Sequence, residues 1–226
     1  MAFPTVATVN YSEEISSVTT HDVLLPTGIS AGDLLLLFLS IDGNPTISDM
    51  PAGWNNIMGA TTANLRGEAW YKFAAGGESD FAYTSSVTER SANRTWRVTG
   101  AHASSAPEFS AQESGFASSA NFPTATPSWG AEDNLWVCFA ALDGSISATG
   151  YPTNFTDNQF TDESGGGVDG AGVGICSQNL NAASLNPDSM TFSASSDFAI
   201  RTFVIRPAAA ATAGPTLRTV ATPLRW

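Results

Sequence analysis

The chain has 226 residues, of which 42% are hydrophobic, and a formal net charge of -12. Because phosphate binding needs clustered Lys and Arg, this balance argues against a nucleic-acid partner. Charged residues make up 13% of the chain, so the surface must be mostly Ser, Thr, Asn, Gln and backbone, as is common where proteins pack against copies of themselves or of a partner. The N-terminus lacks the basic and apolar regions of a secretory signal, so we expect synthesis in a cytoplasm and no membrane partner.

The first elements in chain order are expected to be strands. Residues 3–25 predict two short strands around Tyr11–Glu14. The next run, Leu34–Leu39, contains six apolar residues and ends at the turn dipeptide Asp42-Gly43. Six residues are too few to cross a membrane, and the run lacks the polar positions of an amphipathic helix. It therefore predicts a central strand that is buried on both faces.

The rest of the first half also has the pattern of a β protein. Pro51–Trp54 predicts a turn that delivers an indole to the end of the fold. Glu68–Phe73 is expected to begin a hairpin, with residues 80–85 and 94–99 as its partners. Residues 100–129 are rich in Ala and Ser and predict loops and edge strands.

Several stretches of the second half repeat the first half in the same order. The matched pairs are Leu34–Leu39 with Leu135–Ala140, Asp42-Gly43 with Asp143-Gly144, Pro51–Trp54 with Pro152–Phe155, and Arg94–Val98 with Arg201–Ile205. A shared order of this kind indicates an internal duplication. We predict an all-β chain, an antiparallel β-sandwich of jelly-roll type with internal pseudo-twofold symmetry. It spans residues 1–207, with repeats at about 1–106 and 107–207, and equivalent strands of the two halves are expected to pair into shared sheets.

The segment Tyr151–Gly174 is expected to be a flexible surface loop. Its carboxylates could ligate calcium through oxygen, although their spacing is not that of an EF-hand, so solvated loop carboxylates are the favoured interpretation. These residues are Asp157, Asp162, Glu163 and Asp169. We predict no metal site and no cofactor.

Other patterns suggest chemistry only weakly. Gly28–Gly32 matches the G-x-S-x-G pattern of serine hydrolases, but a strand follows it rather than the required helix. Glutamates at 13, 14, 68 and 78 could supply a glycosidase pair, which depends on separations that the sequence does not show. Cys138 and Cys176 are far apart in the sequence and are interpreted as buried small hydrophobic residues, with a disulfide between them as the less favoured alternative. The tryptophans are interpreted as core residues rather than a carbohydrate platform. No catalytic residue is predicted.

Residues 208–226 are expected to form a linker and an extended C-terminal arm. The arm combines apolar and basic residues in an otherwise acidic chain, and Pro215 and Pro223 disfavour a continuous helix. We predict that it binds another protein subunit through Leu217, Arg218, Leu224, Arg225 and Trp226.

Taken together, the sequence resembles a group of duplicated β-rich proteins encoded by tailed bacteriophages. The resemblance covers most of residues 20–207 and rests on Leu25-Pro26, Ala31–Leu34, Asp42–Pro45, Pro51–Trp54, Trp129–Ala131, Leu135-Trp136, Asp143-Gly144, Tyr151–Phe155 and Ile205–Pro207. It implies a virion structural protein of the head surface or tail, without catalytic residues to carry over.

The function that we expect from this resemblance is that of a capsid decoration or cement protein. Its partners would be the major capsid protein or other virion subunits, and it would self-associate as a trimer. It would be located in a virion assembled in the host cytoplasm. The alternative is a tail or fibre adhesin that binds host-surface glycan, and an enzyme comes third.

Overall fold

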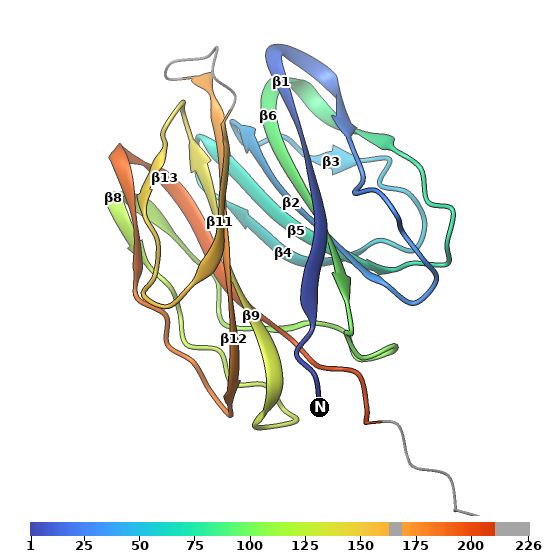
Figure 1. Cartoon of the computed structure of the whole chain (residues 1–226). Helices are drawn as coiled ribbons and strands as arrows, with labels where there is room; N and C mark the ends of the chain where they lie inside the picture. Colours follow the sequence, from blue (N-terminus) through green and yellow to red (C-terminus); the bar gives the residue numbers. More distant parts are fainter. Residues whose placement is uncertain (163–168, 211–226) are drawn as a thin grey trace, which may run out of the picture.

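The computed structural model describes residues 1–162 and 169–210, in which the secondary structure is β-strand without an α-helix. Two antiparallel sheets pack face to face as a β-sandwich (Figure 1). Sheet 1 has the order β1-β6-β2-β5-β4, with β3 also paired to β6, and sheet 2 has the order β10-β13-β9-β12-β11, with β7 and β8 also paired to β13. The strands of sheet 1 are β1 (Thr5–Val23), β2 (Leu34–Asp42), β3 (Ile47–Ser48), β4 (Asn55–Thr61), β5 (Leu65–Phe73) and β6 (Phe81–Thr99). Those of sheet 2 are β7 (Glu108–Phe109), β8 (Glu113–Asn121), β9 (Glu132–Asp143), β10 (Ala148–Gly150), β11 (Thr156–Asp162), β12 (Ala171–Ala182) and β13 (Ser189–Ile205).

The two apolar runs form the middle strand of each sheet, which confirms that they are central strands. In sheet 1, β2 lies between β5 and β6, and in sheet 2, β9 lies between β12 and β13. The register of β2 against β6 matches that of β9 against β13. Leu36 lies opposite Trp96, and Val137, at the corresponding position of β9, lies opposite Phe203. Side chains alternate across a strand, so each run contributes to two cores, one on each face of its sheet.

Three apolar cores stabilise the fold. The core between the sheets contains Leu36 and Phe38 of β2 and Val137 and Phe139 of β9. A second core, on the outer face of sheet 1, is built on Leu35, Leu37, Leu39 and Ile41. The third, on the outer face of sheet 2, is built on Trp136, Cys138, Ala140 and Leu142. This explains why the two runs lack polar residues: both of their faces are covered.

Turns of matching geometry bring an aromatic ring into each outer core. The Trp54 amide donates to the Pro51 carbonyl oxygen at 3.3 Å, and the Phe155 amide donates to the Pro152 carbonyl oxygen at 3.2 Å. The residue before each aromatic has a positive φ, 88° at Gly53 and 67° at Asn154. Gly and Asn are the residues that tolerate this conformation best. Trp54 therefore covers the outer face of sheet 1, and Phe155 covers that of sheet 2.

Two long ribbons bend back over their own sheets and help to cover the outer cores. β1 and β6 are paired from Thr5 opposite Thr99 to Val23 opposite Phe81, with register shifts between Glu14 and Thr20. Within β1, the Ser12 hydroxyl donates to the Asp22 carbonyl oxygen, a contact that a straight strand of that length could not make. The ribbon of β8 and β13 has its own register shift, between Thr191 and Ser196. Figure 1 shows the β1–β6 ribbon curving over at the top of the molecule.

The predicted jelly roll with shared sheets is not confirmed. Each sheet takes all its strands from one half of the chain, β1–β6 or β7–β13, and the chain passes from sheet 1 to sheet 2 once, between Thr99 and Glu108. A jelly roll would alternate strands between the sheets. Each half can instead complete its own sheet because its last strand pairs with its earliest strands, β6 with β1 and β13 with β7 and β8.

Three local predictions were also wrong. Residues 3–25 do not form two short strands: most of them lie in the single strand β1, which bends at its bulges instead of ending. The predicted hairpin between β5 and β6 does not exist, because β2 lies between these strands and pairs with both. The segment Tyr151–Gly174, predicted to be a loop, contains β11, which pairs with β12. No helix among the described residues has the length and apolar character needed to cross a membrane.

Candidate functional site

The residues predicted to bind a partner lie outside the part of the chain that the structure describes. They are Leu217, Arg218, Leu224, Arg225 and Trp226. The described part ends at residue 210, next to a well-ordered attachment point. Pro207 pairs with Ala101 as an isolated bridge, and the Ala208 amide donates to the Gly100 carbonyl oxygen at 2.8 Å. The start of the arm is thus fixed to the junction between the two halves.

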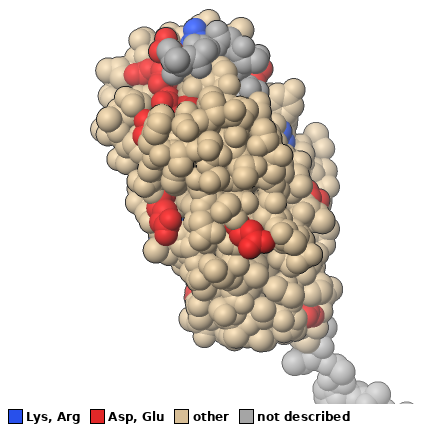
Figure 2. Space-filling model, turned by 90° about the vertical axis from the view of Figure 1, so that its left-hand side faces the viewer, with Lys and Arg blue, Asp and Glu red and all other residues tan. Residues whose placement is uncertain are grey.

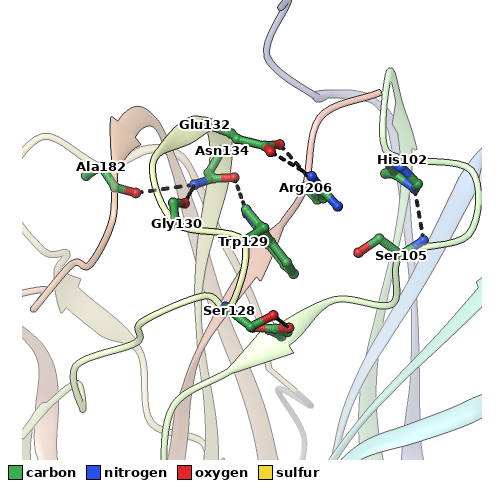
Figure 3. A network of polar contacts seen from close by, with 10 residues as sticks. His102, Ser105, Ser128, Trp129, Gly130, Glu132, Asn134, Ala182 and Arg206 are labelled. Atoms are coloured by element: carbon green, nitrogen blue, oxygen red, sulfur yellow. Dashed lines mark hydrogen bonds and ion pairs between the residues drawn. The ribbon is translucent and has the colours of Figure 1, made fainter. Parts of the chain in front are cut away.

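Polar contacts hold this attachment point in place (Figure 3). Arg206 forms an ion pair with Glu132, with 2.7 Å between Nη2 and Oε1, and lies over the Trp129 ring at 5.7 Å. The Trp129 indole donates to Asn134 Oδ1 at 2.9 Å, and the Asn134 amide donates to the Ala182 carbonyl oxygen at 3.3 Å. The contacts connect the last residues before the arm to β9 and to the end of β12.

Two further contacts lie at the same end of the molecule. The Ser105 amide donates to His102 Nδ1 at 3.1 Å in the connection between the sheets. The N-terminal ammonium is 3.1 Å from a carboxylate oxygen of Asp133, beside Glu132. Both ends of the folded body are therefore anchored here.

Carboxylates gather at the other end of the sandwich, where β2 and β9 end. Asp42 and Asp143 lie close enough to interact through their side chains, and Glu89 and Asp169 act on Asp42 electrostatically. Burial is the main cause that raises the pKa of Asp42 and Glu89. Burial, followed by the charges of Asp42 and Asp197, raises the pKa of Asp143 to about 7.

This cluster does not have the geometry of a metal centre. No group of three or more His, Cys, Asp or Glu residues within 1–162 and 169–210 is arranged to hold a metal ion. Of the four carboxylates considered for calcium, Glu163 lies outside the described residues. Asp157 is instead a hydrogen-bond acceptor for the Ser177 hydroxyl at 2.6 Å.

Two buried titratable side chains, His21 and the glycosidase candidate Glu68, have structural contacts. His21 is fully buried between the hydroxyls of Ser85 and Ser91, each 2.8 Å away, and burial lowers its pKa to about 4. Glu68 is buried, and it accepts hydrogen bonds from Arg66 and from the indole of Trp70. Burial raises the Glu68 pKa despite these bonds. These arrangements satisfy the polar groups of two buried side chains.

The other candidates for chemistry also have local partners. The Ser30 amide donates to Asp33 Oδ2 at 2.8 Å, so residues 28–33 form a turn that leads into a strand, not an elbow before a helix. Glu78 Oε1 and Oε2 accept from the amides of Ala75 and Gly76, and they hold the turn after β5. Trp54, Trp96 and Trp136 are buried, which supports their interpretation as packing residues.

One face of the molecule has very few charges. It is formed by residues 114–131, 144–156 and 177–196, which include β8, β10 and the segments that cover sheet 2, and their only charged residue is Asp188. We call this surface the uncharged face. Figure 2 shows a broad area with few acidic groups below an acidic end. Its exposed positions carry hydroxyl and amide side chains, among them Ser118, Ser119, Asn121, Thr124, Thr149, Thr153, Asn186 and Ser193.

The corresponding segments of sheet 1 are charged. Residues 13–33, 43–54 and 74–90 contain Glu13, Glu14, Asp22, Asp33, Asp49, Glu78, Asp80, Glu89 and Arg90. The two halves of the fold therefore present chemically different outer surfaces.

No protein-family model, curated protein sequence or solved structure matches the chain.

The net charge of the whole chain conceals this face. The signal was present as three long stretches with a single acidic residue. Only the fold shows that these stretches belong to the same sheet, since residues 132–143 and 157–176 separate them in the sequence.

Proposed function

We propose that the chain is a non-enzymatic structural subunit of a tailed-bacteriophage particle, acting as a capsid decoration or cement protein that bridges neighbouring subunits. The observation that carries the proposal is the uneven distribution of charge between the two outer surfaces. It is supported by the fixed attachment point of the arm and by the phage-like sequence pattern described above.

The charge distribution favours contact between copies through the uncharged face. A chain with a net charge of -12 is repelled by its own copies, and bringing like charges together at an interface costs several kcal/mol. Contact through sheet 1 would bring the acidic side chains of two copies together. Contact through the uncharged face avoids this cost and offers many hydroxyl and amide groups for hydrogen bonds.

Phe116 gives this surface an apolar anchor. It lies on β8 and is 71% exposed, the highest value among the large hydrophobic residues of the described chain. Figure 1 places β8 at the left edge of the molecule, on the side that faces the viewer in Figure 2. Buried aromatic side chains commonly supply much of the binding energy at protein interfaces. We therefore assign Phe116 to the contact between copies, which we propose is trimeric.

The test is light scattering coupled to size-exclusion chromatography over a range of concentrations. Wild-type protein should approach the mass of a trimer as the concentration rises, and Phe116→Asp should shift this transition at least tenfold upward. Val87→Asp is the matched control, because Val87 is also an exposed strand residue, 52% accessible, but lies on β6 of sheet 1. A monomer at all concentrations, or an equal effect of the two variants, would contradict self-association through this face.

A second candidate function is a host-glycan adhesin, and one groove favours it. The groove has a volume of about 420 Å³ and is lined by Asn10, Tyr11, Glu14, Asp22 and Leu24, among others. An exposed tyrosine beside amide and carboxylate groups could bind a sugar ring. Tyr11→Ala should abolish binding to a glycan array if this function is correct, whereas the decoration role predicts no glycan binding by either protein.

A further inference from the structure

The two cysteines of the chain lie directly opposite each other in sheet 2. Cys138 on β9 and Cys176 on β12 are register partners in an antiparallel pair that has no irregularity along its length. Both side chains are free and fully buried, and Cys176 is near enough to raise the pKa of the Cys138 thiol. The sequence favoured two buried thiols without a bridge, whereas the pairing of β9 with β12 brings the two residues together.

Direct partners on antiparallel strands have nearly the geometry of a disulfide. Their Cα atoms are about 4.5 or 5.5 Å apart, within the range of roughly 4.4–6.8 Å seen across disulfides. Their Cβ atoms need to approach only slightly, to about 3.8 Å. A bond between these residues therefore requires no rearrangement of the sheet.

The surroundings shield both thiols in the folded protein. Both lie in the outer core of sheet 2. Burial and the neighbouring Cys176 raise the pKa of the Cys138 thiol well above its usual range, so the reactive thiolate is scarce. Tyr151, in the segment that covers this core, is half-buried and lies close to Cys176. We therefore expect the covering segment, residues 144–156, to limit the access of an oxidant to the pair.

We propose that Cys138 and Cys176 form an intramolecular disulfide when the folded protein passes from a reducing to an oxidising environment. Each thiol loses one proton and one electron, and the two sulfurs join. With diamide as the oxidant, both electrons and both protons are taken up by its N=N bond, which becomes the corresponding hydrazine. The bond joins the central strand β9 to β12 and closes the chain between residues 138 and 176.

The inference does not depend on the particle role proposed above. A reducing cytoplasm keeps thiols free, whereas the extracellular medium favours disulfides. A protein assembled in the first environment and released into the second would gain a cross-link without any change in fold. Constraining a loop of this length stabilises a protein chiefly by restricting its unfolded chain, which corresponds to a melting temperature raised by roughly 5–10 °C.

The experiment is to incubate the full-length folded protein with diamide in native buffer, quench it, and measure intact mass and free thiols after unfolding. We expect a loss of two mass units, the disappearance of both thiols, and a single peptide pair containing residues 138 and 176 after digestion. Dithiothreitol should restore the starting mass and melting temperature. Cys176→Ser is the control, and it should retain its remaining thiol under the same conditions.

A second variant tests the role of the covering segment. Tyr151→Ala should form the bond at least several-fold faster than the wild type, because Cys176 becomes easier to reach. The proposal is overturned if both wild-type thiols still react in denaturant after prolonged oxidation of the folded protein. It is also overturned if oxidation links separate chains and leaves residues 138 and 176 unconnected.

Discussion

Arg94 of β6 and Arg201 of β13 occupy corresponding positions in the two sheets, and each reaches across to the edge strand of the other sheet. Arg94 lies opposite Phe38, and Arg201 lies opposite Phe139. Arg94 donates to the Phe160 carbonyl oxygen of β11 at 2.7 Å, and Arg201 donates to the Ile57 carbonyl oxygen of β4. The same kind of contact, from an arginine side chain to a backbone carbonyl oxygen, therefore links the two sheets at both edges of the sandwich.

Replacing either arginine by methionine should destabilise the protein. The change keeps much of the apolar stem but removes a charged donor and leaves a carbonyl oxygen without its partner, which costs on the order of 2 kcal/mol per site. Urea denaturation would measure the loss. Lys72→Met is the control, because its ion pair with Glu78 lies within one sheet and should contribute less than ~1 kcal/mol. Equal effects at the three positions would mean that the links between the sheets contribute no special stability.

Gly67 marks a close contact between the sheets. A Cβ atom at this position would lie 2.5 Å from the Cβ of Ala141 on β9, which is too close for carbon atoms. Gly67→Ala should force the sheets apart locally and destabilise the fold by ~1–3 kcal/mol. Gly59→Ala on β4 is the matched control, since its nearest neighbour would be 3.9 Å away. Thermal unfolding should show a lower melting temperature for the first variant and little change for the second.

Asp143 should make the protein less stable as the pH rises. Its folded-state pKa, raised to about 7 from an ordinary value of 3.8, means that the folded protein binds a proton more tightly than the unfolded chain. Stability is then greatest below about pH 4 for this group and falls as the pH rises towards 7. Asp42 and Glu89 shift in the same direction and add to the effect.

The measurement is the urea midpoint of unfolding between pH 5 and pH 8. Asp143→Asn should reduce the fall in stability over this interval, because the amide stays neutral. Asp188→Asn also removes one negative charge, but it is exposed and lies outside the cluster, so it should leave the slope unchanged. An identical pH profile for Asp143→Asn and the wild type would show that the carboxylates are solvated and do not repel one another.

The C-terminal arm should be dispensable for folding but needed for attachment. Deletion of residues 214–226 should leave the melting temperature of the isolated protein unchanged, because the described contacts at the base of the arm end at Ala208. The truncated protein should bind less tightly to particles that lack the wild-type protein. Full occupancy of such particles by the truncated form, measured by quantitative mass spectrometry, would exclude the arm as an anchor.

The sequence predicted the central strands well because their signal is local. Leu34–Leu39 and Leu135–Ala140 are continuous apolar runs bounded by turn residues, and both proved to be middle strands with the same register. The turns at Trp54 and Phe155 were also recognisable, since Gly53 and Asn154, residue types that tolerate a positive φ, precede an aromatic residue in each half.

Other features could not be predicted because they depend on which strands become neighbours. β5 and β6 are consecutive in the chain, yet β2 pairs with both, so proximity in sequence gave the wrong hairpin. The bend in β1 depends on bulges opposite β6, and the Cys138–Cys176 contact depends on the β9–β12 register. The uncharged face is likewise a property of the folded surface, because its segments come together only when β8 pairs with β13.

Electron cryomicroscopy of purified phage particles that carry this chain would test the proposed structural role. If the proposal is correct, density for a two-sheet sandwich should appear at regular positions on the head, with β8 and the uncharged face turned towards neighbouring copies. Absence of the protein from particles washed at high salt, or attachment through the acidic outer surface of sheet 1, would contradict it.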